Sequence, residues 1–135
     1  MEISKRKNPW GQAPRNPLFD PNIFYRTVPL ASLERGDPDY ISEQFYWRGP
    51  VWPRLNNLAV RGLIAYGHRA EAERLARSWY DGCASLFVRF RGFYENVSSE
   101  QLDHPKTHLC APDYTGDACL APVVFPALFK WRKSQ

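Results

Sequence analysis

One strongly periodic apolar stripe limits the possible fold more than any other feature of the chain. Between residues 69 and 90, apolar side chains recur every three or four positions, which is the spacing of one helix face. The members of this stripe are Ala72, Leu75, Ala76, Trp79, Cys83, Leu86, Phe87 and Phe90. A helix is therefore predicted for residues 69–90.

A second helix is predicted just before it, over residues 53–66. Its expected apolar face consists of Leu55, Leu58, Ala59, Gly62, Leu63 and Tyr66. Pro53 suits the first helical turn, and Gly67 suits the C-terminal cap. Because only Gly67-His68-Arg69 joins the two helices, they are expected to form an antiparallel pair.

The rest of the chain is less regular. Residues 1–50 contain seven prolines, each of which disfavours helix at the preceding position. This part is expected to be an extended arm that lies on other structure. Residues 92–116 are expected to form a long polar loop, and residues 119–131 a last helix that Pro122 opens and Pro126 kinks. The prediction is an all-α fold of about three helices with an extended N-terminal arm.

Composition and charge argue against several classes of protein. A chain of 135 residues is one domain or part of a larger one. Its net charge of +4 comes from scattered lysines and arginines, so nucleic acid is not an expected partner. The sequence has no apolar run that could span a membrane and no hydrophobic core of a signal peptide, so no membrane association and a cytoplasmic location are expected.

The cysteines and histidines do not indicate a metal site. Three cysteines are an odd number without a CxxC pair, which favours free thiols in a reducing compartment. A zinc site from His104, His108, Cys110 and Cys119 would have no standard spacing. No metal and no cofactor are therefore expected.

The segment YWRGPVW, Tyr46 to Trp52, is a candidate sugar-binding surface. Sugar rings present apolar C–H faces that stack on aromatic rings, and guanidinium donors reach hydroxyl oxygens. The predicted binding residues are Tyr46, Trp47, Arg48, Gly49 and Trp52. The alternative is an arginine that stacks on tryptophan only for packing.

Glu95 is the candidate general base. It lies in Phe93-Tyr94-Glu95-Asn96, just past the end of the long helix, and partial desolvation by flanking aromatics tunes a carboxylate toward this role. The alternative is a surface glutamate in a loop. No serine, cysteine or histidine stands in a recognisable nucleophile motif.

Taken in order along the chain, these segments resemble the C-terminal part of glycoside hydrolase family 63. The resemblance rests on Tyr46–Trp52, on the helix pair, on Tyr94-Glu95-Asn96, and upstream on Phe24–Ser32 and Asp37–Tyr40. It implies that residues 20–135 are a C-terminal segment of an (α/α)6 six-hairpin barrel, preceded by an irregular basic tail over residues 1–19.

The resemblance also implies a reaction. Family members hydrolyse O-glycosidic bonds with inversion, which uses two carboxylates on opposite sides of the sugar. It assigns the general base to Glu95, and Tyr94, beside that base, is expected to be a further substrate-binding residue. The sequence departs from the family in Val97-Ser98-Ser99, where a tyrosine and an Asp-Pro pair are usual.

No residue of this chain matches the family's general acid. The chain alone is therefore expected to be inactive, with the missing N-terminal part of the barrel as its partner and a glucoside, mannoside or small oligosaccharide as substrate. Two alternatives stay open, a trehalase-like or glycogen-debranching glucosidase and a noncatalytic helical module that binds sugar or a partner protein.

Overall fold

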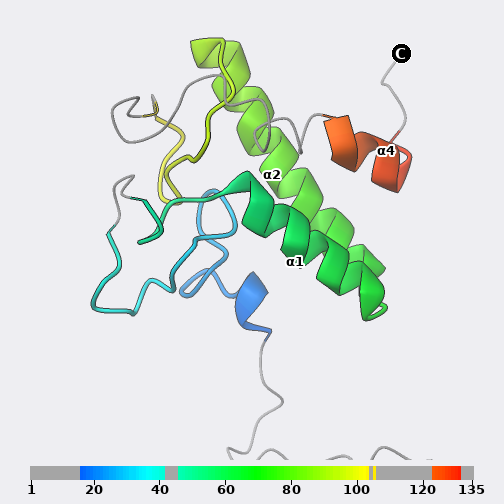
Figure 1. The fold of residues 1–135 in the computed structure, drawn as a ribbon, viewed down its shortest axis with the longest axis horizontal. Helices are drawn as coiled ribbons and strands as arrows, with labels where there is room; N and C mark the ends of the chain where they lie inside the picture. The colour runs from blue at the N-terminus through cyan, green and yellow to red at the C-terminus, as the bar shows by residue number, and fades with distance from the viewer. Residues whose placement is uncertain (1–15, 42–45, 104, 106–122, 132–135) are drawn as a thin grey trace, which may run out of the picture.

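The computed structural model describes residues 16–41, 46–103, 105 and 123–131, and its regular elements are helices (Figure 1). They are the short 3-10 helix η1 (Pro17–Phe19) and the α-helices α1 (Pro53–Ala65), α2 (Arg69–Phe90) and α4 (Phe125–Phe129). β-structure in these residues is limited to two isolated bridges. The all-α class is confirmed, as expected of a segment of a helical-barrel glycosidase. In the described residues, no helix combines the length and the apolar character that a membrane span requires.

The predicted antiparallel helix pair is confirmed. The chain reverses between α1 and α2 at Gly67, whose φ of 84° lies in the left-handed region that favours glycine. Its N–H donates to the carbonyl of Ile64 at 3.0 Å, and the N–H of His68 donates to that of Leu63 at 2.8 Å. These two bonds form a Schellman motif, which ends α1 and turns the chain directly into α2.

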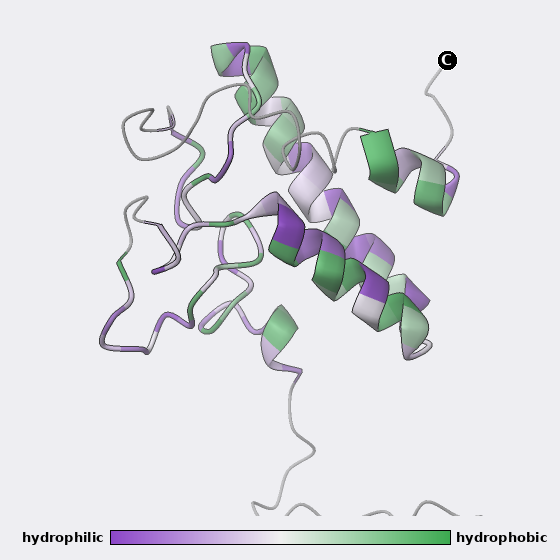
Figure 2. Cartoon of the chain, viewed as in Figure 1, coloured by the Kyte–Doolittle hydropathy of each residue, from purple (hydrophilic) through white to green (hydrophobic). Residues whose placement is uncertain are grey.

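The buried face of α1 differs from the predicted one. The residues that are buried are Pro53, Asn56, Val60 and Leu63. Of the predicted face only Leu63 is buried, whereas Leu58 is 59% exposed and Tyr66 is 85% exposed. The prediction was wrong because the buried face contains a polar residue, Asn56, whose Oδ1 accepts the backbone N–H of Leu30 at 3.2 Å. Hydrophobic residues lie on both faces of α1, because Val60 and Leu63 are buried whereas Leu58 and Tyr66 are exposed, so periodicity alone does not identify the buried face. Figure 2 shows hydrophobic and hydrophilic positions alternating along α1.

The apolar stripe of α2 forms the centre of the core, as predicted. Its buried members are Ala72, Leu75, Ala76, Trp79, Cys83 and Leu86, with Gly82 between them. Trp79 is the largest fully buried side chain, at 1% exposure. Phe87 is more exposed than expected, at 38%, and stacks on Phe93 at the edge of the core, with ring centroids 4.8 Å apart.

The arm packs on the helix pair of the same chain. Val28 and Leu30 are buried in the core. Arg74 of α2 lies over the rings of Phe19 and Tyr25, at 4.7 Å and 5.1 Å from their centroids. The arm is therefore part of the core, although its described residues, 16–41 and 46–50, contain no helix other than η1.

The last helix is shorter than predicted in its described part. Val123 and Val124 form a wider helical turn, and α4 follows. Pro126 lies in the first turn of α4, where its missing N–H is harmless. The predicted kink concerns a helix whose first residues, 119–122, lie outside the described residues. The helix ends at Phe129 rather than at residue 131 because Lys130 adopts a left-handed φ of 54°. Residues 106–122, which include Pro122, lie outside the described residues.

The position of Trp79 leads to a prediction about stability. Replacing it with alanine should lower the free energy of unfolding by about 3–5 kcal/mol, because a large buried ring leaves a cavity. Val88→Ala, at a side chain 66% exposed on the same helix, should change it by less than about 0.5 kcal/mol. Urea unfolding followed by circular dichroism measures both. Similar losses in the two variants would contradict this description of the core.

Candidate active site

Three aromatic rings form a compact cluster just before α1. Trp47 stacks on Trp52 with ring centroids 3.9 Å apart and an interplanar angle of 17°. Tyr46 meets both indoles edge to face, at 5.7 Å and 5.8 Å. Trp52 is buried at 6% exposure, and its indole N–H donates to the carbonyl of Tyr46 at 2.9 Å. Tyr46 and Trp47, exposed by 65% and 39%, therefore present the outer surface, and Trp52 supports them from behind.

Arg48 is held by the arm. Its Nε donates to the carbonyl of Asp39 and its Nη2 to Oδ1 of the same residue, both at 2.9 Å. These bonds use two of the five N–H donors of a guanidinium group, and the side chain is 43% exposed. No local sequence signal predicts this ion pair, because no acidic residue lies next to Arg48 in the chain.

Gly49 has a structural reason to be glycine. Its φ of 137° is outside the range that other residues adopt readily. A Cβ atom at this position would lie 2.5 Å from the carbonyl oxygen of Ile41 and 3.0 Å from the ring of Tyr40. The turn from residue 46 to residue 52, which we call the aromatic turn, therefore packs directly on the arm.

The loop that carries Glu95 is paired with the aromatic turn. Val51 donates its N–H to the carbonyl of Val97 at 2.8 Å, and Val97 donates its own to Val51 at 3.1 Å. This antiparallel bridge joins residues 94–100, which we call the acid loop, to the residue before Trp52. Glu95 is half-buried, two residues from the bridge. Figure 1 shows the loop returning from the end of α2 to the start of α1.

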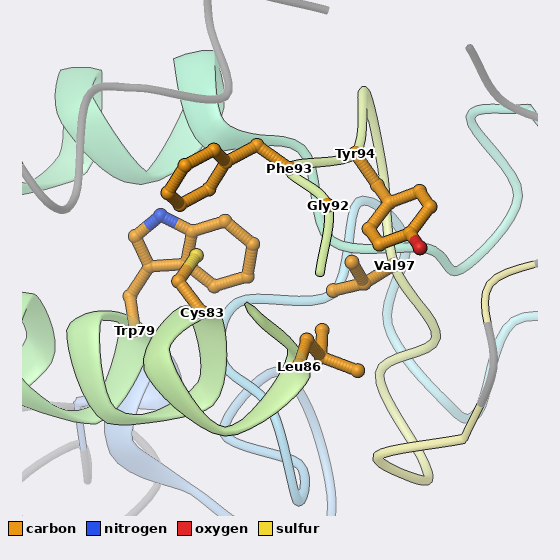
Figure 3. A pocket seen from close by; sticks show the side chains of 7 residues that line it. All are labelled: Trp79, Cys83, Leu86, Gly92, Phe93, Tyr94 and Val97. Atoms are coloured by element: carbon orange, nitrogen blue, oxygen red, sulfur yellow. The ribbon is translucent and has the colours of Figure 1, made fainter. Parts of the chain in front are cut away.

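The acid loop is part of the predicted polar loop, residues 92–116, but much of it is buried. Its buried members are Tyr94, Asn96, Val97 and Ser99. Tyr94 is 7% exposed and lines a small space with residues of α2, among them Trp79 and Cys83 (Figure 3). At about 10 Å³ this space holds at most one water molecule, so a sugar does not fit in it. The structure thus places Tyr94 in the core.

A polar cluster that the sequence did not predict fixes the end of the acid loop. Arg26 holds Glu100 through two hydrogen bonds of 2.8 Å, one to each carboxylate oxygen. The hydroxyl of Tyr40 donates to Glu100 at 2.5 Å and lies 2.8 Å from Oγ of Ser99. The hydrogen bonds from Arg26 and then from Tyr40 hold the pKa of Glu100 below its ordinary value. Burial, followed by the bond to Glu100, raises the pKa of Tyr40.

Metal-binding residues do not converge in the described part of the chain. There, no group of three or more histidine, cysteine or acidic side chains could hold an ion. The four residues weighed as a zinc site, His104, His108, Cys110 and Cys119, lie outside the described residues. Cys83 is a buried free thiol, and burial raises its pKa, so it is a core residue rather than a reactive one.

The Arg26–Glu100 pair predicts a pH-dependent stability. Because the pKa of Glu100 is lowered in the folded protein, its contribution is present above the unfolded pKa and is lost as pH falls through the folded one. Glu100→Gln should cost about 2 kcal/mol at neutral pH and flatten the acid-side loss of stability below about pH 5. Urea unfolding across this range measures both, with exposed Glu34→Gln as the control. An acid-side loss as steep as that of the unmodified chain would contradict the prediction.

The chain is similar in sequence to known glycoside hydrolases. Residues 7–101, well over half of the chain, match the family model of the mannosylglycerate hydrolase MGH1-like glycoside hydrolase domain. A mannosylglycerate hydrolase from Rubrobacter radiotolerans is 38% identical over 68 residues, which are 50% of this chain and 14% of that protein. A mannosyl-oligosaccharide glucosidase from Saccharomyces cerevisiae is 33% identical over 49 residues, which are 36% of this chain and 6% of that protein.

The matched part of the chain contains the segments described above. It includes the arm from residue 16 onward, the aromatic turn, both long helices and the acid loop. The chain spans only a small share of the length of these two relatives. The resemblance to family 63 is confirmed, and the chain belongs to the MGH1-like glycoside hydrolase family.

Proposed function

We propose that this chain supplies the general base and one sugar-binding wall of an inverting glycoside hydrolase. Glu95 activates the attacking water, and the aromatic turn binds the sugar that is released. The observation that carries the proposal is the Val51–Val97 bridge, because it holds the loop of Glu95 against the aromatic turn. Two segments far apart in the sequence are thus adjacent where one sugar could contact both.

The sugar wall consists of the exposed parts of the turn. Tyr46 and Trp47 offer apolar ring surface for the C–H face of a sugar, and Trp52 backs them. Arg48 is oriented by Asp39 and retains exposed surface from which its other N–H donors can reach hydroxyl groups. Gly49 allows the turn to pack closely on the arm, so it affects sugar binding through the shape of the turn and not through a direct contact.

Inversion requires a second carboxylate. The base and the acid of an inverting glycosidase stand about 6.5–9.5 Å apart, with water between the base and the anomeric carbon. Glu95 fills the first role in this proposal. We assign the general acid to polypeptide outside these residues, which would form the opposite wall of the site. Tyr94, a predicted neighbour of the base, would act from the core by fixing the loop.

An exposed hollow on α1 indicates that another helix packs there. A hollow of about 370 Å³ lies there, lined by Leu18, Ala59, Gly62, Leu63, Tyr66 and His68. Leu58 on the same helix is 59% exposed. An apolar helix face of this kind is typical of a surface that packs on another helix. We propose that the remaining helices of the glycosidase domain cover it.

The names of the relatives support a substrate class. One is named for mannosylglycerate and the other for mannosyl-oligosaccharides. We therefore propose a mannoside, a glucoside or a small oligosaccharide that contains them.

The role of Glu95 gives a kinetic prediction. In the active glycosidase that contains this chain, Glu95→Gln should lower kcat by roughly 10²–10⁴-fold, because the amide cannot accept the proton of water. KM should change little, since sugar binding rests on the aromatic turn. Hydrolysis of aryl mannosides and glucosides measures both constants. Asp81→Asn, at an exposed carboxylate of α2, is the matched control and should leave kcat unchanged.

Two outcomes would contradict the proposal. An unchanged kcat in Glu95→Gln would remove the glutamate from the reaction. Robust hydrolysis by the 135-residue chain alone would contradict the assignment of the acid to other polypeptide, because a lone base leaves the departing oxygen unprotonated.

A further inference from the structure

Tyr40 touches both segments of the proposed site. Its ring packs on Gly49 of the aromatic turn, where a Cβ atom would lie 3.0 Å from Cε2 of the ring. Its hydroxyl reaches the acid loop, at 2.5 Å from Glu100 and 2.8 Å from Ser99. The half-buried side chain of Tyr40, from the arm, thus lies between the aromatic turn and the acid loop.

The residues on either side of Tyr40 bind the aromatic turn as well. Asp39 accepts two hydrogen bonds from Arg48. The backbone N–H of Ile41 donates to the carbonyl of Arg48 at 2.7 Å. Residues 39–41 therefore fix the position of the turn through backbone, ion pair and ring contact together.

The acid loop is held on its other side by the same arm. Arg26 binds both carboxylate oxygens of Glu100. The N–H of Val28 donates to the carbonyl of Ser99 at 3.0 Å, and Ser99 is 1% exposed. Because Val97 is paired with Val51, Glu95 stands next to a stretch of loop that is anchored on two sides.

We propose that Tyr40 is a positioning residue that sets the spacing between the aromatic turn and the acid loop. The inference rests on the proposed function, because these segments carry the sugar-facing rings and Glu95. Such spacing matters for catalysis, since a misplacement of about 1 Å can cost about 10²-fold in rate. The hydroxyl is the critical group, because it bonds Glu100 and Ser99 of the acid loop while the ring contacts Gly49.

The test uses Tyr40→Phe in the 135-residue chain without sugar. This variant keeps the ring on Gly49 and removes the bonds to Glu100 and Ser99. Hydrogen exchange of the Val51 and Val97 amides, followed by NMR, should become about tenfold faster. This is the effect expected from the loss of one hydrogen bond to a charged group. The indole N–H signal of Trp52 should shift as well, while the amides of α2 should exchange as before.

Tyr25→Phe is the matched control. It also removes one tyrosine hydroxyl of the arm, but this hydroxyl bonds Ser78 of α2 at 2.5 Å rather than the acid loop. It should leave the Val97 amide and the Trp52 signal unchanged, whatever its effect on overall stability. A role of Tyr40 in general stability alone would make the two variants alike at these probes, and that result would overturn the inference.

A second variant covers the case in which Tyr40→Phe does not fold. Glu100→Gln keeps the shape of the acceptor and removes its charge, so it should speed exchange at Val97 and shift the Trp52 signal in the same direction. If neither probe responds, the inference is wrong. Because these readouts need no hydrolysis, they are independent of the kinetics of Glu95→Gln. A failure of the base assignment and a failure of the spacing role are thus distinguishable.

Discussion

The pairing of Val51 with Val97 is the contact on which the rest of the site depends. It consists of two backbone hydrogen bonds in the core, where Val51 is fully buried and Val97 is 4% exposed. Buried backbone groups must find partners, so this pairing also satisfies donors and acceptors that would be costly to leave alone. It fixes the register between the turn before α1 and the loop after α2. The helix pair then acts as a rigid support for two irregular segments.

Much of this architecture could be predicted from the sequence because it depends on local rules. The stripe of α2, the cap at Gly67 and the proline at the start of α1 each act through neighbouring residues. The buried face of α1 could not be predicted in the same way. Asn56 is buried because it binds the backbone of Leu30 in the arm, and periodicity of apolar residues does not register such a long-range polar contact.

The candidate site was predictable only in part, for the same reason. The aromatic turn and the acid loop are visible as short segments, and the family resemblance sets them in order. The ion pair of Arg48 with Asp39 and the cluster of Arg26, Tyr40 and Glu100 join residues from different segments. Their only sequence signal was that the arm segments around Arg26 and Tyr40 resemble the family. In the structure these segments hold the aromatic turn and the acid loop in place.

A crystal structure of the active glycosidase with its product bound tests most directly whether the aromatic turn and Glu95 of the acid loop face one sugar. We expect a sugar ring stacked on Tyr46 and Trp47, with the carboxylate of Glu95 one water molecule away from the anomeric carbon. A Glu95 carboxylate that points into bulk solvent, on the far side of the helix pair from Arg48, would contradict this expectation.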